Sequence, residues 1–187
     1  AAGRRPSEIA ILYRTNFQSR SFEQEFAIAN IPFAVLDSVA FFQRKEVKDL
    51  RAYLQVLINP QDDEALLRII NKPTRGIGAK TVEKLRKLAR KHGRDLLSVC
   101  LDEKAISSLG TRTRKNVRVF GELMAGLRDL TSDEIAELIR QIIKRTGYLE
   151  SMKEDDRPAS EEVIDHFLPV AEQFDREPEE EHRLRRF

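Results

Sequence analysis

A turn between two helical patterns, at residues 72–81, constrains the architecture of this chain more than any other feature. The helical pattern of residues 64–71 stops at Pro73, because proline disfavours helix in the preceding residue and has no backbone N–H of its own. A second amphipathic pattern starts at about Ala79, with apolar residues recurring at helical spacing. The stretch is therefore predicted to form a helix-hairpin-helix.

Glycines and cations together indicate that this turn binds phosphate. We expect Gly76 and Gly78 to permit positive φ and close approach of a ligand, with Ile77 anchoring the turn in the core. Residues 68–94 carry a net charge of +9, whereas the whole chain carries +2. Because N–H groups, a helix start and cations converge, we predict a nucleic-acid phosphate site here; a solvated helix face beside an ordinary turn is the alternative. The predicted contact residues are Thr74, Arg75, Gly76, Ile77, Gly78, Lys80, Thr81 and Lys84.

The same stretch superficially resembles an ATP-binding phosphate loop. The Walker pattern needs one glycine directly before the lysine and another five positions earlier, but these positions hold Ala79 and Thr74. The three histidines lie far apart, without cysteine or carboxylate at metal-ligand spacing. We therefore expect no catalytic residue, no metal and no cofactor in this chain.

Composition favours a helix-rich protein of a reducing compartment. Charged residues make up 34% of the chain and aromatic residues 7%, with no Trp, which is unlike a β-sandwich or barrel. The single cysteine, Cys100, cannot form an internal disulfide. No signal peptide and no apolar run near 18 residues are present. A cytoplasmic protein without membrane contact is the expectation.

The chain divides by pattern into two parts. Residues 1–40 contain short apolar runs at 8–13 and 31–36 around a predicted helix that ends at Asn30, which indicates a β-α-β piece. Residues 41–187 follow helical periodicity to the end. A second basic cluster opens a later helix, where cations oppose the helix dipole, so it could extend the phosphate footprint or be a solvated face. Its members are Arg112, Arg114, Lys115 and Arg118.

Three stretches in order resemble successive motifs of the UvrD/PcrA/Rep-type superfamily 1 DNA helicases. They are Ile-Leu-Tyr-Arg-Thr-Asn-Phe-Gln-Ser-Arg at 11–20, Phe-Phe-Gln-Arg-Lys-Glu-Val-Lys-Asp at 41–49 and Asn-Lys-Pro-Thr-Arg-Gly-Ile-Gly at 71–78. The resemblance covers residues 8–91 strongly and the remainder only by helical pattern. Two departures stand out: Asp37-Ser38 replaces the Gly-Gly of relatives, and Ala40 replaces a lysine that often reaches single-stranded DNA.

The resemblance implies a fragment of a larger motor. Residues 1–40 would begin the second RecA-like motor domain, 2A, and residues 41–187 would form most of the inserted helical domain, 2B. It also implies that Arg14 and Asn16 contact single-stranded DNA, that residues 74–78 grip duplex DNA, and that the whole protein uses ATP and Mg. Its partners would be DNA at a junction of duplex and single strand, the rest of the motor, and repair or transcription proteins.

The leading interpretation is the duplex-binding and regulatory region of an ATP-dependent 3′→5′ DNA helicase of DNA repair or replication, inactive as an ATPase by itself. One alternative is a stand-alone helix-hairpin-helix module that binds duplex DNA. Another is a helical platform that docks an acidic protein. The apolar runs at 8–13 and 31–36 favour the first interpretation, because a stand-alone module has no use for them.

Overall fold

The computed structural model describes residues 9–13, 18–33, 35, 41–130 and 134–175. The chain forms two compact units, Ala1–Gln43 and Arg44–Phe187. All regular elements within the described ranges are helices, which confirms the prediction of a mainly α protein. None of these helices is both long and apolar enough to cross a membrane.

Helix α1 (Ser19–Ile28) lies in the first unit. Its aromatic side chains make a small cluster with the segment that follows the helix. The Phe26 ring lies 6.5 Å from that of Phe22 and 5.6 Å from that of Phe33, measured between centroids. This cluster folds the segment after α1 back onto the helix.

The two strands predicted on either side of α1 are not confirmed. The described residues of these runs, 9–13, 31–33 and 35, form no strand. Leu12 is 95% exposed, so its side chain is not in a core. Two short strands without further strands beside them cannot make a stable sheet, which accounts for the difference.

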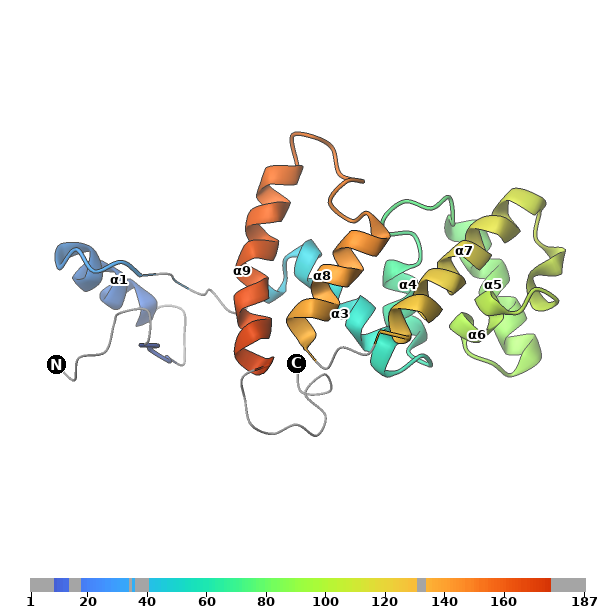
Figure 1. Cartoon of the computed structure of the whole chain (residues 1–187), viewed down its shortest axis with the longest axis horizontal. Helices are drawn as coiled ribbons and strands as arrows, with labels where there is room; N and C mark the ends of the chain where they lie inside the picture. Colours follow the sequence, from blue (N-terminus) through green and yellow to red (C-terminus); the bar gives the residue numbers. More distant parts are fainter. Residues whose placement is uncertain (1–8, 14–17, 34, 36–40, 131–133, 176–187) are drawn as a thin grey trace. The chain divides into compact units, whose positions relative to one another are not determined.

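The second unit is a set of helices joined by short connections (Figure 1). They are α3 (Lys45–Ile58), α4 (Asp63–Ile69), α5 (Ala79–His92), α6 (Leu96–Leu101), the short 3₁₀ helix η3 (Ala105–Ser108), α7 (Thr111–Arg128), α8 (Ile135–Thr146) and α9 (Arg157–Asp175).

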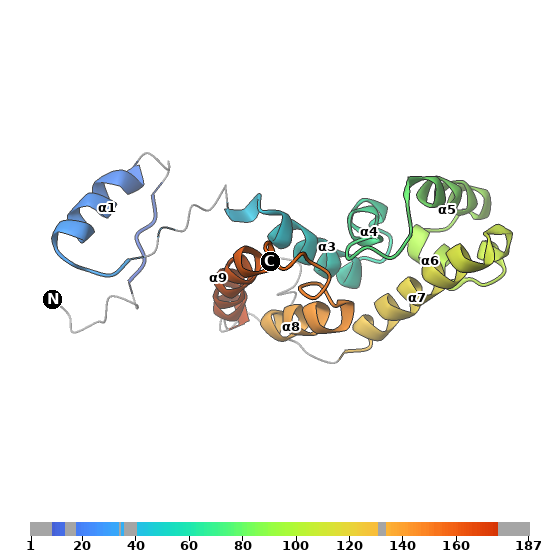
Figure 2. The same ribbon diagram turned by 90° about the horizontal axis from the view of Figure 1, so that it is seen from above.

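Helix α3 is central to the packing of this unit. It contacts α4, α7, α8 and α9, and its residues Val47, Leu50 and Leu54 are buried, as helical periodicity predicts. Helices α5, α6 and α7 pack together as a second group. Figure 2 shows this group beside the one formed by α3, α4, α8 and α9. The turn between α4 and α5 therefore lies where the two groups meet.

Aspartates close the N-termini of several helices. Asp62 caps α4 by accepting a hydrogen bond from the Ala65 amide at 2.9 Å, and Asp95 caps α6 in the same way at 2.7 Å. The first two amides of α8 donate to Asp175 of α9 at 2.8 and 3.0 Å.

Candidate nucleic-acid interface

The turn predicted to bind phosphate is a loop that joins α4 to α5. Helix α4 ends at Ile69, two residues before the predicted end at residue 71, and α5 begins at Ala79, as the sequence predicts. The Asn71 side chain fixes the turn from within, because its Oδ1 accepts from the amides of Arg75 at 2.7 Å and Ile77 at 3.1 Å. Ile77 is only 1% exposed, which confirms that it anchors the loop in the core.

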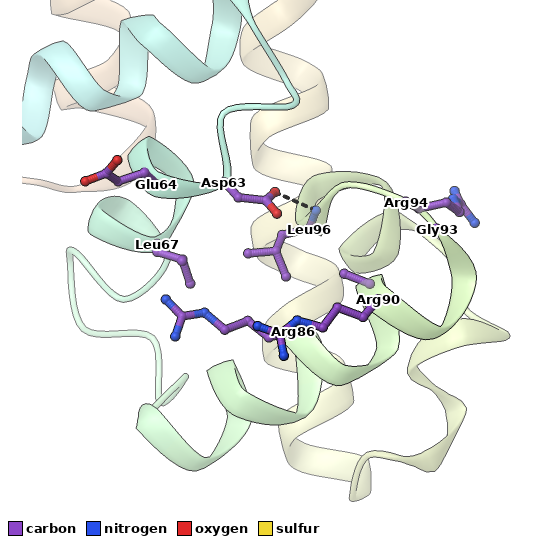
Figure 3. A pocket seen from close by; sticks show the side chains of 9 residues that line it. Asp63, Glu64, Leu67, Arg86, Arg90, Gly93, Arg94 and Leu96 are labelled. Atoms are coloured by element: carbon purple, nitrogen blue, oxygen red, sulfur yellow. Dashed lines mark hydrogen bonds between the residues drawn. The ribbon is translucent and has the colours of Figure 1, made fainter.

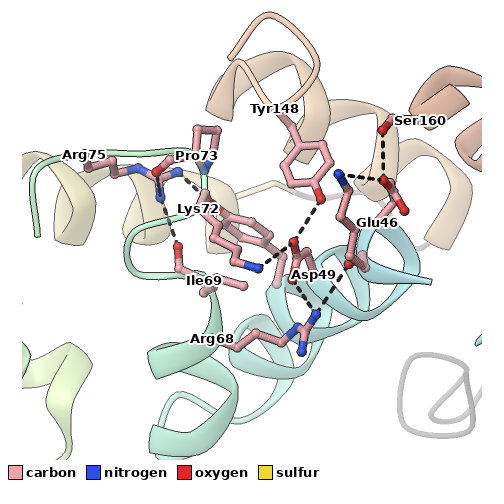
Figure 4. Close-up of polar contacts among 11 residues, drawn as sticks. Glu46, Asp49, Arg68, Ile69, Lys72, Pro73, Arg75, Tyr148 and Ser160 are labelled. Carbon is pink, nitrogen blue, oxygen red and sulfur yellow. Dashed lines mark hydrogen bonds and ion pairs between the residues drawn. The ribbon is translucent and has the colours of Figure 1, made fainter. Parts of the chain in front are cut away.

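The Arg75 guanidinium lies against the protein rather than toward solvent (Figure 4). It donates to the carbonyl oxygens of Ile69 at 3.0 Å and Pro73 at 3.2 Å, and to the Tyr53 hydroxyl at 2.7 Å. It also lies 5.3 Å from the centroid of the Phe120 ring of α7. In the structure this side chain satisfies carbonyl groups left at the end of α4, and the phosphate contact expected of Arg75 stays a prediction.

The buried carboxylate of Asp49 pairs with Lys72, the residue that precedes Pro73. Asp49 of α3, 2% exposed, pairs with Arg68 Nη2 at 2.7 Å and with Lys72 Nζ at 3.5 Å. The Tyr148 hydroxyl, between α8 and α9, donates to Asp49 Oδ2 at 2.9 Å (Figure 4). Burial, followed by the charge of Asp49, raises the pKa of Tyr148, so the phenol stays a neutral donor. Asp49 thus connects the loop to α3 and to the last two helices.

The N-terminus of α5 is left open. Its N-cap is Gly78, which has no side chain to accept a hydrogen bond, in contrast to Asp62 on α4 and Asp95 on α6. Within the part of the chain that the structure describes, four exposed amides around this helix start have no acceptor. They belong to Gly76, Gly78, Ala79 and Lys80.

Two exposed cations lie in the first two turns of α5, close in sequence to these amides. Lys80 and Lys84 are exposed, and neither forms an ion pair with any residue within the described ranges. Lys87, one turn later, pairs with Glu83 at 2.9 Å. Thr74 is exposed on the loop, whereas Thr81 is half-buried. Thr74, Gly76 and Gly78 are thus exposed residues of the loop, and Lys80 and Lys84 are exposed in the first two turns of α5.

Gly76 and Gly78 differ in backbone conformation and in the space around the Cα atom. Gly76 has φ +71°, which side chains rarely adopt, and a Cβ there would approach Asn116 Nδ2 of α7 to 2.9 Å, so the loop favours glycine at this position. Gly78 has φ −81° and ψ 177°, and a Cβ there would meet no atom within 4 Å. The expectation of positive φ at both glycines is wrong for Gly78, because that residue is an extended N-cap, a conformation any residue adopts.

A shallow groove of about 610 Å³ lies on a different face of α5 (Figure 3). Arg86 and Arg90 line it from α5, and Asp63 and Glu64 line it from α4. Asp63 accepts from the Leu96 amide at 2.8 Å. Because this groove carries charges of both signs, it suits a phosphate backbone less well than the loop.

The remaining predictions concern single-stranded DNA, metal binding and catalysis. Arg14 and Asn16 lie outside the described residues. No group of His, Cys, Asp and Glu within the described ranges has a geometry that could hold a metal ion. Burial raises the pKa of the Cys100 thiol to about 12, so this cysteine is not a nucleophile at neutral pH.

Sequence reasoning missed the residues that hold the loop in place. Tyr53 reads as one more core position of α3, yet its hydroxyl donates to the Lys72 carbonyl at 2.5 Å and accepts from Arg75. Asn71 carried a usable signal, because asparagine before a turn often bonds backbone amides a few residues on. Asp49 carried none, since its partners are distant in sequence.

Comparison with known proteins identifies similar chains over the whole length. Residues 2–187 match the sequence model of the UvrD-like helicase C-terminal domain. An ATP-dependent DNA helicase PcrA from Leuconostoc citreum is 32% identical over 173 residues, covering 90% of this chain and 23% of the relative. Helicases of the same name from Staphylococcus epidermidis and Staphylococcus aureus are 33% and 34% identical over 190 residues, covering 100% and 99% of this chain. The chain spans about a quarter of the length of these relatives.

Proposed function

This chain belongs to the family of UvrD-like helicase C-terminal domains, and we propose on that basis that it is the duplex-binding and regulatory region of an ATP-dependent 3′→5′ DNA helicase. The relatives that it resembles are named ATP-dependent DNA helicases, which supports a helicase as the parent protein. Residues 1–40 begin the motor domain 2A in this proposal, and residues 41–187 form most of the inserted domain 2B.

The single observation that carries the duplex-binding role is the open start of α5. Amides of Gly76, Gly78, Ala79 and Lys80 have no acceptor in the described chain, and two exposed cations, Lys80 and Lys84, lie in the first two turns of α5. Backbone amides at a helix N-terminus bind phosphate oxygens, and they read no base sequence. The α4–loop–α5 unit acts in this proposal as a helix-hairpin-helix that holds the duplex by its backbone.

ATP and Mg²⁺ belong, in this proposal, to other parts of the helicase. The described residues offer no carboxylate group suited to a metal, and the sequence has no Walker pattern, so this chain's own residues do not fit an ATP–Mg site. The chain alone is therefore expected to hydrolyse no ATP. Its partners are DNA and the rest of the motor, with Arg14 and Asn16 assigned to single-stranded DNA by resemblance only.

The salt dependence of duplex binding tests this proposal. Titration of a labelled duplex with the chain should give a plot of log K against log salt with a slope of roughly −3 to −4.5, since about three to five phosphates are neutralised. Affinity should not depend on base sequence and should be higher for duplex than for single-stranded DNA. Lys84→Ala should make the slope less steep by about one unit.

Arg128, an exposed cation at the far end of α7, provides the matched control for loss of one charge. Arg128→Ala should leave both affinity and slope close to those of the parent chain. Equal losses for the two variants would mean that binding follows net charge rather than the loop. Absence of duplex binding, with capture of an acidic protein instead, would favour the docking-platform interpretation.

A further inference from the structure

The first turns of α7 lie against the loop. A Cβ on Gly76 would come within 2.9 Å of Asn116 Nδ2. The Arg75 guanidinium lies 5.3 Å from the ring centroid of Phe120, one turn further along α7. Residues 116 and 120 are four apart, so they share one face of the helix. That face of α7 therefore borders the proposed phosphate site.

The four cations at the start of α7 fall on different faces. Arg112 is four residues before Asn116 and so lies on the loop-facing side, about 6 Å along the helix axis. Arg114 is two residues from Asn116, which places it on the opposite side. Arg118 pairs with Glu103 at 3.1 Å and with Glu122 at 3.4 Å. Lys115, three residues after Arg112, neighbours it on the helix surface, so the helix separates Arg112 and Lys115 from Arg114 and Arg118.

We propose that Arg112 binds a further backbone phosphate of the duplex held by the loop. The inference rests on the proposed function and extends its contact surface from α5 to α7. Arg112 is exposed and forms no ion pair with any described residue, so no protein carboxylate competes for it. The rise along α7 from Asn116, which borders the loop, to Arg112 is about 6 Å, of the same order as one or two nucleotide steps along a strand, whose rise is about 3.4 Å per nucleotide.

The position of Arg112 in its helix also favours this role. A cation in the first turn opposes the helix dipole, so the residue contributes nothing to the stability of α7. Arg112→Ala should therefore leave the midpoint of thermal unfolding unchanged or slightly raised. Loss of binding in this variant would then reflect loss of a DNA contact rather than loss of fold.

Titration of the labelled duplex against Arg112→Ala and Arg118→Ala tests the inference. Arg112→Ala should weaken binding by about threefold to tenfold and reduce the salt slope by about 0.9, because one phosphate contact is lost. Arg118→Ala should bind within about twofold of the parent, since its guanidinium is shared between two glutamates. Arg112→Lys should restore most of the affinity, because it keeps the charge.

The outcomes separate this inference from the proposed function. If Lys84→Ala weakens binding while Arg112→Ala binds like the parent, the Arg112 contact is refuted and the loop site remains. Equal losses in Arg112→Ala and Arg118→Ala would also refute it, because the effect would then be one of charge alone. If neither Lys84→Ala nor Arg112→Ala alters binding, both proposals fail.

Discussion

Gly78→Asp is expected to lower duplex affinity by at least about fiftyfold while making the protein slightly more stable. The carboxylate would cap α5 in the way that Asp62 caps α4 and Asp95 caps α6. The backbone permits this, since Gly78 has φ −81° and ψ 177°, close to the values of Asp95, and a Cβ there meets no atom within 4 Å. By analogy with those two caps the carboxylate would accept from the Thr81 amide, three residues on, and its negative charge beside the amides proposed to hold phosphate would repel the DNA.

The stability gain should be about 0.5 kcal/mol, measured as the free energy of unfolding in urea, because aspartate is a better cap than glycine and its charge complements the helix dipole. Gly78→Asn is the matched control, since it can cap α5 without adding a charge, and an intermediate loss of affinity is expected. Opposite signs for stability and binding exclude misfolding as the cause. If Gly78→Asp binds duplex as tightly as the parent chain, the amides at the start of α5 are not part of the DNA-binding site.

Asp49→Ala is expected to lower the free energy of unfolding by about 2–4 kcal/mol, the largest stability effect of any change considered. Asp49 is buried and connects α3 with Arg68, Lys72 and Tyr148. The Arg68 and Lys72 side chains are 35% and 50% exposed, so they can turn toward water, and most of the cost arises at the Tyr148 hydroxyl and the emptied space.

Urea unfolding of Asp49→Ala, Tyr148→Phe and the double variant measures this effect. Tyr148→Phe alone should cost about 1 kcal/mol, because the carboxylate keeps its two cationic partners. The double variant should cost less than the two single changes added together, since they remove one shared hydrogen bond. Full additivity, or an Asp49→Ala variant as stable as the parent, would show that this contact does not hold the loop to the last helices.

The sequence predicts the helices well because apolar spacing of 3.6 residues determines which faces are buried. The start of α5 at Ala79, the Asp62 cap of α4 and the burial of Ile77 all agree with local pattern. The strands expected at 8–13 and 31–36 are not confirmed, because an apolar run predicts a strand only when partner strands exist to pair with it.

Long-range contacts determine what the sequence could not predict about the loop. Arg75 reads as one cation among ten, yet Tyr53, far away in the sequence, and the carbonyl oxygens at the end of α4 turn its guanidinium inward. Gly76 and Gly78 look equivalent in the pattern Gly-Ile-Gly. Of these two glycines only Gly76 has positive φ, and a Cβ added there would approach Asn116 Nδ2 of α7.

The central claim, that free amides at the start of α5 hold the duplex backbone, can be tested by following those amides in a ¹H–¹⁵N correlation spectrum while a short blunt duplex is added. We predict large shifts for Gly76, Gly78, Ala79 and Lys80, whose N–H groups lack acceptors in the described chain. Gly147, beyond the end of α8, should not move. Saturable duplex binding that shifts other resonances and leaves these four amides unchanged would contradict the account.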